Sequence, residues 1–93
     1  MPWTAEAGAD PARVTLAGIV DIFEAIPLHA VLRDLAREPR EVVVDASACS
    51  GLDSSALQLL LALREALDAG GGRLVLEAGD GPAARLLGRF GLL

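Results

Sequence analysis

The sequence has no lysine and no tyrosine, one cysteine, one tryptophan and two phenylalanines among its 93 residues. All of its basic residues are arginines, eight in number, and they are spread along the chain without forming a basic run. Thirteen residues are acidic, so the formal charge is -5. Recognition of nucleic acids or of an anionic membrane surface needs a cluster of positive charge. The composition therefore argues against both as partners.

The sequence motifs that carry catalysis are also missing, although Ser, His and Asp all occur. Cys49 is alone, so it can form neither an internal disulfide nor a cysteine-built metal site, and His29 has no second histidine or cysteine at ligand spacing. The segments Gly70-Gly71-Gly72 and Gly79-Asp80-Gly81 lack the Lys and Ser/Thr of a phosphate-binding loop and do not form a dinucleotide fingerprint. No segment resembles the nucleophile elbow of a hydrolase. We expect a non-catalytic protein without cofactor or metal.

No long apolar run is present. Residues 1–13 lack the basic stretch and apolar core of a signal peptide, and the longest nearly apolar run, 57–63, is too short to cross a bilayer. Hydrophobic residues make up 53% of the chain and charged residues 23%, which is typical of a globular protein. A chain of this length suits one domain. We therefore expect a single domain over residues 1–93, located in the cytoplasm.

Hydrophobic periodicity divides the chain into alternating strands and helices. Pro27 fits only in the first turn of a helix, which places the start of the first helix between Glu24 and Ile26. The continuous apolar run in Glu41–Ala46 is typical of a strand covered on both faces, and the sequence after it, Ser47–Leu52, indicates a loop. The expected strands are 3–7 at an edge, ahead of a turn at 8–11, then 13–19, 41–46 and 73–78, and the expected helices are 24–37, 54–69 and 82–90.

This order of elements predicts an α/β domain. Strand–helix–strand units cross over with one hand and place successive strands parallel and adjacent. The expected architecture is a mostly parallel sheet of about four strands with helices packed on it.

The segment from Val42 to Leu63 is the most informative part of the chain. It predicts a buried strand, a loop, and a helix that opens at Asp53, Ser54 and Ser55. The first turn of a helix presents unpaired backbone N–H groups and a partial positive charge. Asp53 or Ser54 can simply cap that helix. Alternatively, a serine hydroxyl at this end is a position where a phosphate is well tolerated.

The same segment resembles the STAS domains, the fold of bacterial anti-sigma-factor antagonists. The family pattern is a strand ending in Asp, a short Ser-containing loop and Asp-Ser-Ser-Gly-Leu at a helix start; here these are Val42–Asp45, Ser47 and Asp53–Leu57. Further segments match in the same order, so that the resemblance covers about residues 13–92: Leu16–Asp21, Gly71–Leu76, Pro82–Leu87 and Gly91–Leu92.

The resemblance implies a binding switch. An antagonist with an unmodified serine binds an anti-sigma factor that is also a serine kinase, and phosphorylation by that kinase releases it. The modified serine of the family falls on Ser55, with Ser54 as the second choice. We expect partner contacts through the segment before the helix and through its exposed leucines, at Asp45, Ser47, Asp53, Ser54, Leu59 and Leu63.

An alternative remains open. Short members of the family with a leucine-rich helix like Ala56–Leu63 resemble constitutive small subunits of chemotaxis-type signalling or phospholipid-transport complexes. Such a subunit would bind its partner whatever the state of the serine. A homodimer through the same leucine-rich helix is a further possibility, because one helix cannot turn all of its leucines toward the sheet.

Overall fold

The structure, a computed structural model, describes residues 3–6, 8 and 11–92. Four strands form one sheet in the order β1-β2-β3-β4. β1 pairs antiparallel with β2, while β2, β3 and β4 are parallel. The elements are β1 (Trp3–Glu6), β2 (Ala12–Val20), α1 (Ile22–Leu35), β3 (Glu41–Leu52), α2 (Ser54–Ala69), β4 (Arg73–Glu77) and α3 (Pro82–Arg89).

The α/β architecture and the mostly parallel four-stranded sheet are confirmed. The edge strand expected at 3–7 is present over Trp3–Glu6, and Ala7 lies outside the described residues, as do positions 9 and 10 of the expected turn. Within the described residues, no helix combines the length and apolar character that crossing a bilayer requires.

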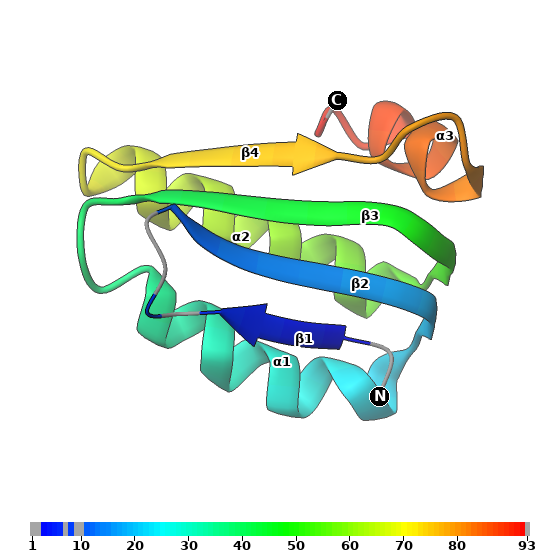
Figure 1. The fold of residues 1–93 in the computed structure, drawn as a ribbon, viewed down its shortest axis with the longest axis horizontal. Coiled ribbons are helices and arrows are strands. Elements are labelled where there is room, and N and C mark those ends of the chain that lie inside the picture. The colour runs from blue at the N-terminus through cyan, green and yellow to red at the C-terminus, as the bar shows by residue number, and fades with distance from the viewer. Residues whose placement is uncertain (1–2, 7, 9–10, 93) are drawn as a thin grey trace.

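Helices α1 and α2 lie side by side on the same face of the sheet, and neither of them covers the opposite face (Figure 1). The strand order explains this arrangement. The chain moves from β2 to β3 to β4 in one direction, so crossovers of the same hand place both helices on the same side. The expected burial of β3 on both faces is found for Val42, Val43 and Val44, although α1 and α2 cover only one face of the strand.

The core lies between the sheet and the helices. Val42 and Val44 point into it and are fully buried, whereas Val43 points to the bare face and is still only 8% exposed. Its direct neighbour on β2 is Arg13, whose aliphatic stem can shelter an apolar side chain on an open sheet face. The three consecutive valines are thus buried for two reasons: Val42 and Val44 pack in the core, and Val43 lies beside the side chain of Arg13 on the other face of the sheet. β4, expected to be buried, is a half-buried edge strand.

Helix α1 begins earlier than the proline suggests. The carboxylate of Asp21 accepts hydrogen bonds from the backbone N–H groups of Phe23 (3.0 Å) and Glu24 (3.3 Å), and so caps a helix that starts at Ile22. Pro27 consequently lies in the second turn, where it removes one intrahelical hydrogen bond at an exposed position. The expected start at 24–26 is wrong because the aspartate cap outweighs the preference of proline for the first turn.

The segment 47–52 is the largest difference from expectation. It is not a loop but the second half of β3, and it pairs with β2 from Ala17 to Val20. The pairing shifts register twice, between Thr15 and Ala17 and between Gly18 and Ile19. Bulges of this kind break the strict alternation of side chains, which is why the segment has no period of two and does not look like a strand in the sequence.

Candidate functional site

Helix α2 starts directly where β3 ends. The backbone N–H of Asp53 donates to the carbonyl of Val20 (3.2 Å), which fixes the junction to the end of β2. The Asp53 carboxylate accepts from the backbone N–H of Ala56 (3.2 Å) and its carbonyl accepts from Leu57 (3.1 Å). Asp53 is therefore the N-cap of α2, and Ser54 and Ser55 occupy the first two positions of the helix.

The two serines differ in their surroundings. Ser54 is exposed, and its hydroxyl forms no hydrogen bond within the part of the chain that the structure describes. Ser55 is half-buried, and its hydroxyl donates to Oδ1 of Asp53. That hydrogen bond, followed by the backbone N–H of Ala56, lowers the pKa of the Asp53 carboxyl below its ordinary value. The carboxylate is thus held ionised beside the hydroxyl of Ser55.

A second Asp-x-Ser motif lies earlier on β3. Oδ1 of Asp45 accepts from the hydroxyl (2.6 Å) and the backbone N–H (2.9 Å) of Ser47, and Oδ2 accepts from Arg13 (3.3 Å). These hydrogen bonds lower the pKa of Asp45, the Ser47 hydroxyl contributing most. Arg13 also pairs with Glu77 (3.0 Å), so this motif belongs to an ion-pair cluster on the bare sheet face.

The structure does not bring the expected site residues into one cluster. Asp53 lies six positions after Ser47 along the chain, which corresponds to roughly 20 Å of extended strand. Ser47 lies against the loop between β4 and α3, where a Cβ atom at position 79, occupied here by glycine, would lie 3.7 Å from the Cβ of Ser47. Asp53, Ser54 and Ser55 lie at the junction of β2 with α1. Cys49, between the two clusters, is buried, and burial raises the pKa of its thiol.

The two leucines of the expected partner surface also separate. Leu59 is half-buried and lies between α2 and α1, where it reaches the surface. Leu63 is only 3% exposed and belongs to the core, so it offers a partner little surface of its own. Both follow from the helix period: Leu63 shares the buried stripe of Leu60 and Leu67, and Leu59 lies at its edge.

An exposed apolar surface at the start of α1 was missed by sequence reasoning. Gly18 adopts a positive φ of 66 at the register shift, a conformation that glycine adopts freely, and the following Ile19 turns outward. The large side chains exposed here are Ile19 (66%), Ile22 (57%), Phe23 (81%) and Ile26 (73%). A signal was present in the sequence: Ile22, Phe23 and Ile26 fall outside the buried stripe of Ala25, Leu28, Leu32 and Leu35.

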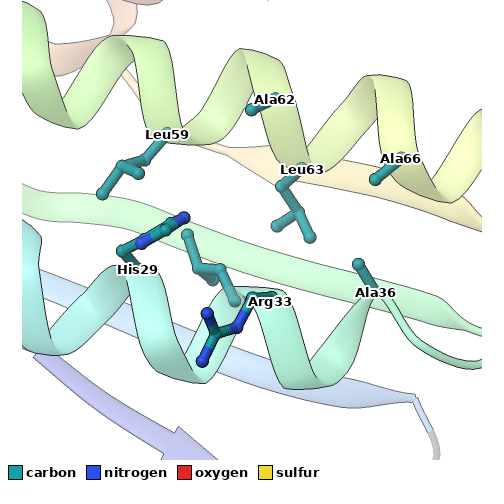
Figure 2. A pocket seen from close by; sticks show the side chains of 8 residues that line it. His29, Arg33, Ala36, Leu59, Ala62, Leu63 and Ala66 are labelled. Atoms are coloured by element: carbon teal, nitrogen blue, oxygen red, sulfur yellow. The ribbon is translucent and has the colours of Figure 1, made fainter.

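This apolar surface continues into a groove between α1 and α2. One hollow, of about 450 Å³, is bordered by Ser55 at the start of α2 and by Ile22 and Ile26 of α1. A second, of about 160 Å³, extends along the helices past Leu59 and Leu63 to Ala66. Figure 2 shows His29 and Leu59 pointing toward one another across the gap, with Leu63 projecting from α2 toward α1. Ser55 therefore stands at the end of an apolar groove.

The fold and the α2 junction place the protein in a known class. A family model described as "Mlab, STAS domain" matches residues 3–92, so the chain belongs to the STAS domain family. The resemblance seen in the sequence is thereby confirmed. A search of curated proteins finds no match.

Solved structures show the same fold. SpoIIAA, the anti-sigma factor antagonist and cell fate determinant of Bacillus, is 21% identical in both its unphosphorylated and its phosphorylated form, with TM-scores of 0.78 and 0.79. The alignments cover 95% and 97% of this chain and 82% and 84% of SpoIIAA. An anti-sigma factor antagonist from Mycobacterium paratuberculosis is 28% identical with a TM-score of 0.75, over 97% of this chain and 77% of that one.

A similar fold also occurs inside a larger protein. The structure titled Mglu is 24% identical with a TM-score of 0.69, and the alignment covers 83% of this chain but only 19% of Mglu. The chain thus spans about a fifth of that protein and most of the length of the antagonists.

Proposed function

We propose that this chain is a non-catalytic, partner-binding STAS module of the anti-sigma-factor-antagonist type, and that phosphorylation of Ser55 switches its binding off. Ser54 is the second choice for the modified residue. The proposed partner is a serine kinase that is also an anti-sigma factor, and the proposed place of action is the cytoplasm, with residues 1–93 acting as one domain. The observation that carries the proposal is the position of the Ser55 hydroxyl, on the first turn of α2 and at the border of an apolar groove.

The charge added by phosphorylation explains how such a switch works. A phosphoserine carries about -1.5 to -2 charges at neutral pH. At Ser55 the phosphate replaces the hydrogen bond to Asp53 and gains the backbone N–H groups of the first helical turn, so the fold tolerates it. A partner that covers the groove would have to bury this charge beside the Asp53 carboxylate. Desolvating an unpaired charge is costly, and the modified protein therefore releases its partner.

The alternative of a constitutive subunit is favoured by the exposed apolar residues. Phe23 is 81% exposed and Ile26 is 73% exposed, and permanent interfaces are more apolar than transient ones. In this case the serine pair acts only as part of a helix start, and partner affinity depends on the shape and apolar character of the α1 and α2 surface.

The experiment compares wild type with Ser55→Ala, Ser55→Asp and Ser54→Asp, with Ser50→Asp as a matched control at another exposed serine. Each tagged protein is expressed in its native host, the co-purified partner is identified, and its dissociation constant is measured with purified components. Mass spectrometry of the wild type locates any phosphate. We expect Ser55→Asp to weaken binding at least about tenfold, equivalent to about 1.4 kcal/mol, and Ser50→Asp to leave it unchanged. Equal affinity of all variants would refute the switch and leave the constitutive subunit.

A further inference from the structure

The groove between α1 and α2 is continuous along most of both helices. Its two hollows share His29, Leu59 and Ala62. The helices run parallel, because Ile22 and Ser55 border one end of the groove and Ala36 and Ala66 the other. From Ser55 to Ala66 the groove is about 17 Å long at 1.5 Å per residue. This length suits a helix of about three turns.

The lining of the groove favours a helix over other ligands. Small side chains alternate with larger ones along it, namely Ala25, Ala36, Ala62 and Ala66 beside Ile22, Ile26, His29, Leu59 and Leu63. Such a surface accepts the large side chains of a third helix between those of the two flanking helices. The sheet edges lie elsewhere, on β1 and β4, so no strand can pair here. An amphipathic helix satisfies its own backbone hydrogen bonds and needs only an apolar face to bind.

The charges around the groove indicate the chemistry of the occupant. At the end formed by the first turns of α1 and α2 lie Asp21, Glu24 and Asp53, and no described residue of those turns is basic. Arg33 borders the opposite end of the groove. The whole chain carries a charge of -5. Complementary potentials steer a partner and fix its orientation, so the end of the partner helix that lies over Asp21 and Glu24 should be basic.

We infer that the α1–α2 groove binds an amphipathic helix from a protein partner. This helix presents a face of large apolar side chains to the groove and carries Lys or Arg at the end that lies over Asp21 and Glu24. The regulatory part of this inference rests on the proposed function. Ser55 borders the groove and Ser54 is exposed outside its lining. A phosphate on Ser55 therefore enters the groove itself, where it meets the apolar face of the partner helix rather than the Lys or Arg that lies over Asp21 and Glu24, whereas a phosphate on Ser54 stays outside the groove lining.

The test begins with the contact itself. The photoreactive residue p-benzoylphenylalanine is placed at position 26, on the groove, or at position 90, which is also exposed in the wild type but lies at the end of α3. Full-length protein is cross-linked in the native host, and the attached peptide is identified by mass spectrometry. We expect position 26, and not position 90, to cross-link an amphipathic helical segment of net positive charge. A strand, an acidic segment, a lipid, a second copy of this chain, or no product above that of position 90 would overturn the inference.

The second step uses the cross-linked segment as a synthetic peptide. Its affinity is measured by fluorescence anisotropy for wild type, Ile26→Asp and the matched control Phe90→Asp, after thermal melts have confirmed that each variant is folded. Ile26→Asp should weaken binding at least tenfold, and Phe90→Asp should change it by less than twofold. Equal effects of the two variants would overturn the groove as the binding site.

The same assay separates this inference from the proposed function. Ser55→Asp should weaken peptide binding at least tenfold, whereas Ser54→Asp should weaken it less than threefold. If Ile26→Asp abolishes binding and Ser55→Asp does not, the groove is supported as the binding site and the phosphorylation switch is refuted. If Ser55→Asp releases the partner while position 26 gives no cross-link to a basic helix, the phosphorylation switch is supported and the groove is refuted as the binding site.

Discussion

Two Asp-x-Ser motifs lie on the same strand and its extension, and they make the same local contact. In each, the serine hydroxyl donates to Oδ1 of the aspartate two residues earlier, and the same oxygen accepts a backbone N–H. Asp45 and Ser47, however, belong to the ion-pair cluster with Arg13 on the bare sheet face. Asp53 and Ser55 cap a helix at the end of an apolar groove. The Asp-x-Ser motif by itself therefore does not define a functional site. The Asp53 motif differs from the Asp45 motif in that it lies beside an apolar groove.

Partner affinity should give the largest contrast between the two motifs. We expect Ser55→Asp to weaken partner binding at least tenfold, because the added charge must be desolvated at the groove. Ser47→Asp places the same charge against the loop before α3, and we expect a change of less than twofold. Isothermal titration with the purified partner measures both. A comparable loss for Ser47→Asp would mean that the partner spans both motifs, as the sequence had suggested.

Thermal stability should show a smaller contrast in the same direction. Replacing a helix N-cap aspartate by alanine removes a hydrogen bond that no other group supplies. Asp53→Ala should lower the melting temperature by roughly 3 to 8 °C for a domain of this size. Asp45→Ala removes contacts on an open sheet face and should lower it by roughly 1 to 3 °C. Calorimetry of the two variants at pH 7 checks the order, and the reverse order would show that the ion-pair cluster contributes more to the stability of the fold than the cap of α2.

The acid limb of the stability curve tests the electrostatics of both motifs. The pKa values of Asp45 and Asp53 are lowered in the folded state, so the unfolded chain binds more protons and each group's contribution is lost as the pH falls through the folded pKa. Above the unfolded pKa of about 3.9 the contribution is complete. Asp53→Asn keeps a good cap but cannot titrate, so urea unfolding from pH 6 down to pH 2.5 should show a shallower loss than wild type. An unchanged slope for both Asp53→Asn and Asp45→Asn would contradict the assignment.

The sequence predicted much of the fold because most elements carry a clean period. The leucine stripe of α2 and the valine run of β3 are local signals that tertiary structure did not override. The second half of β3 was not predicted as a strand because two register shifts interrupt the alternation of its side chains between the two faces of the sheet. A bulge depends on the neighbouring strand rather than on the segment itself. The start of α1 was misplaced because the side-chain cap of Asp21 was not weighed against Pro27.

The candidate site was predicted in part. The local sequence predicts a cap at Asp53 or Ser54 and a serine on the first turn of α2, and the structure shows that Asp53 is the cap. The separation of Ser47 from Ser55 could not be predicted, because the segment between them was expected to be a loop. A loop can fold back and bring the two serines together, whereas the observed strand keeps them apart. The exposure of Phe23 and Ile26 is equally hard to read from composition, since an apolar residue near a helix start is as compatible with a core as with a surface. The local signal that decides between the two is the helical stripe of Ala25, Leu28, Leu32 and Leu35, which leaves Phe23 and Ile26 outside it.

The smallest expected effect concerns the bare sheet face itself. Arg13 bridges Asp45 and Glu77 with all three side chains partly or largely exposed, and exposed ion pairs contribute about 0 to 1 kcal/mol to the free energy of unfolding. Arg13→Met keeps an apolar stem over Val43 while removing the charge, whereas Arg13→Ala removes both. We expect urea unfolding to show that Arg13→Met costs less than Arg13→Ala, since shelter of the valine matters more than the ion pairs. Equal losses of unfolding free energy would mean that the charge of Arg13, and not its aliphatic stem, stabilises this face of the sheet. The Asp45 and Asp53 motifs would then differ in their electrostatics rather than in their apolar surroundings.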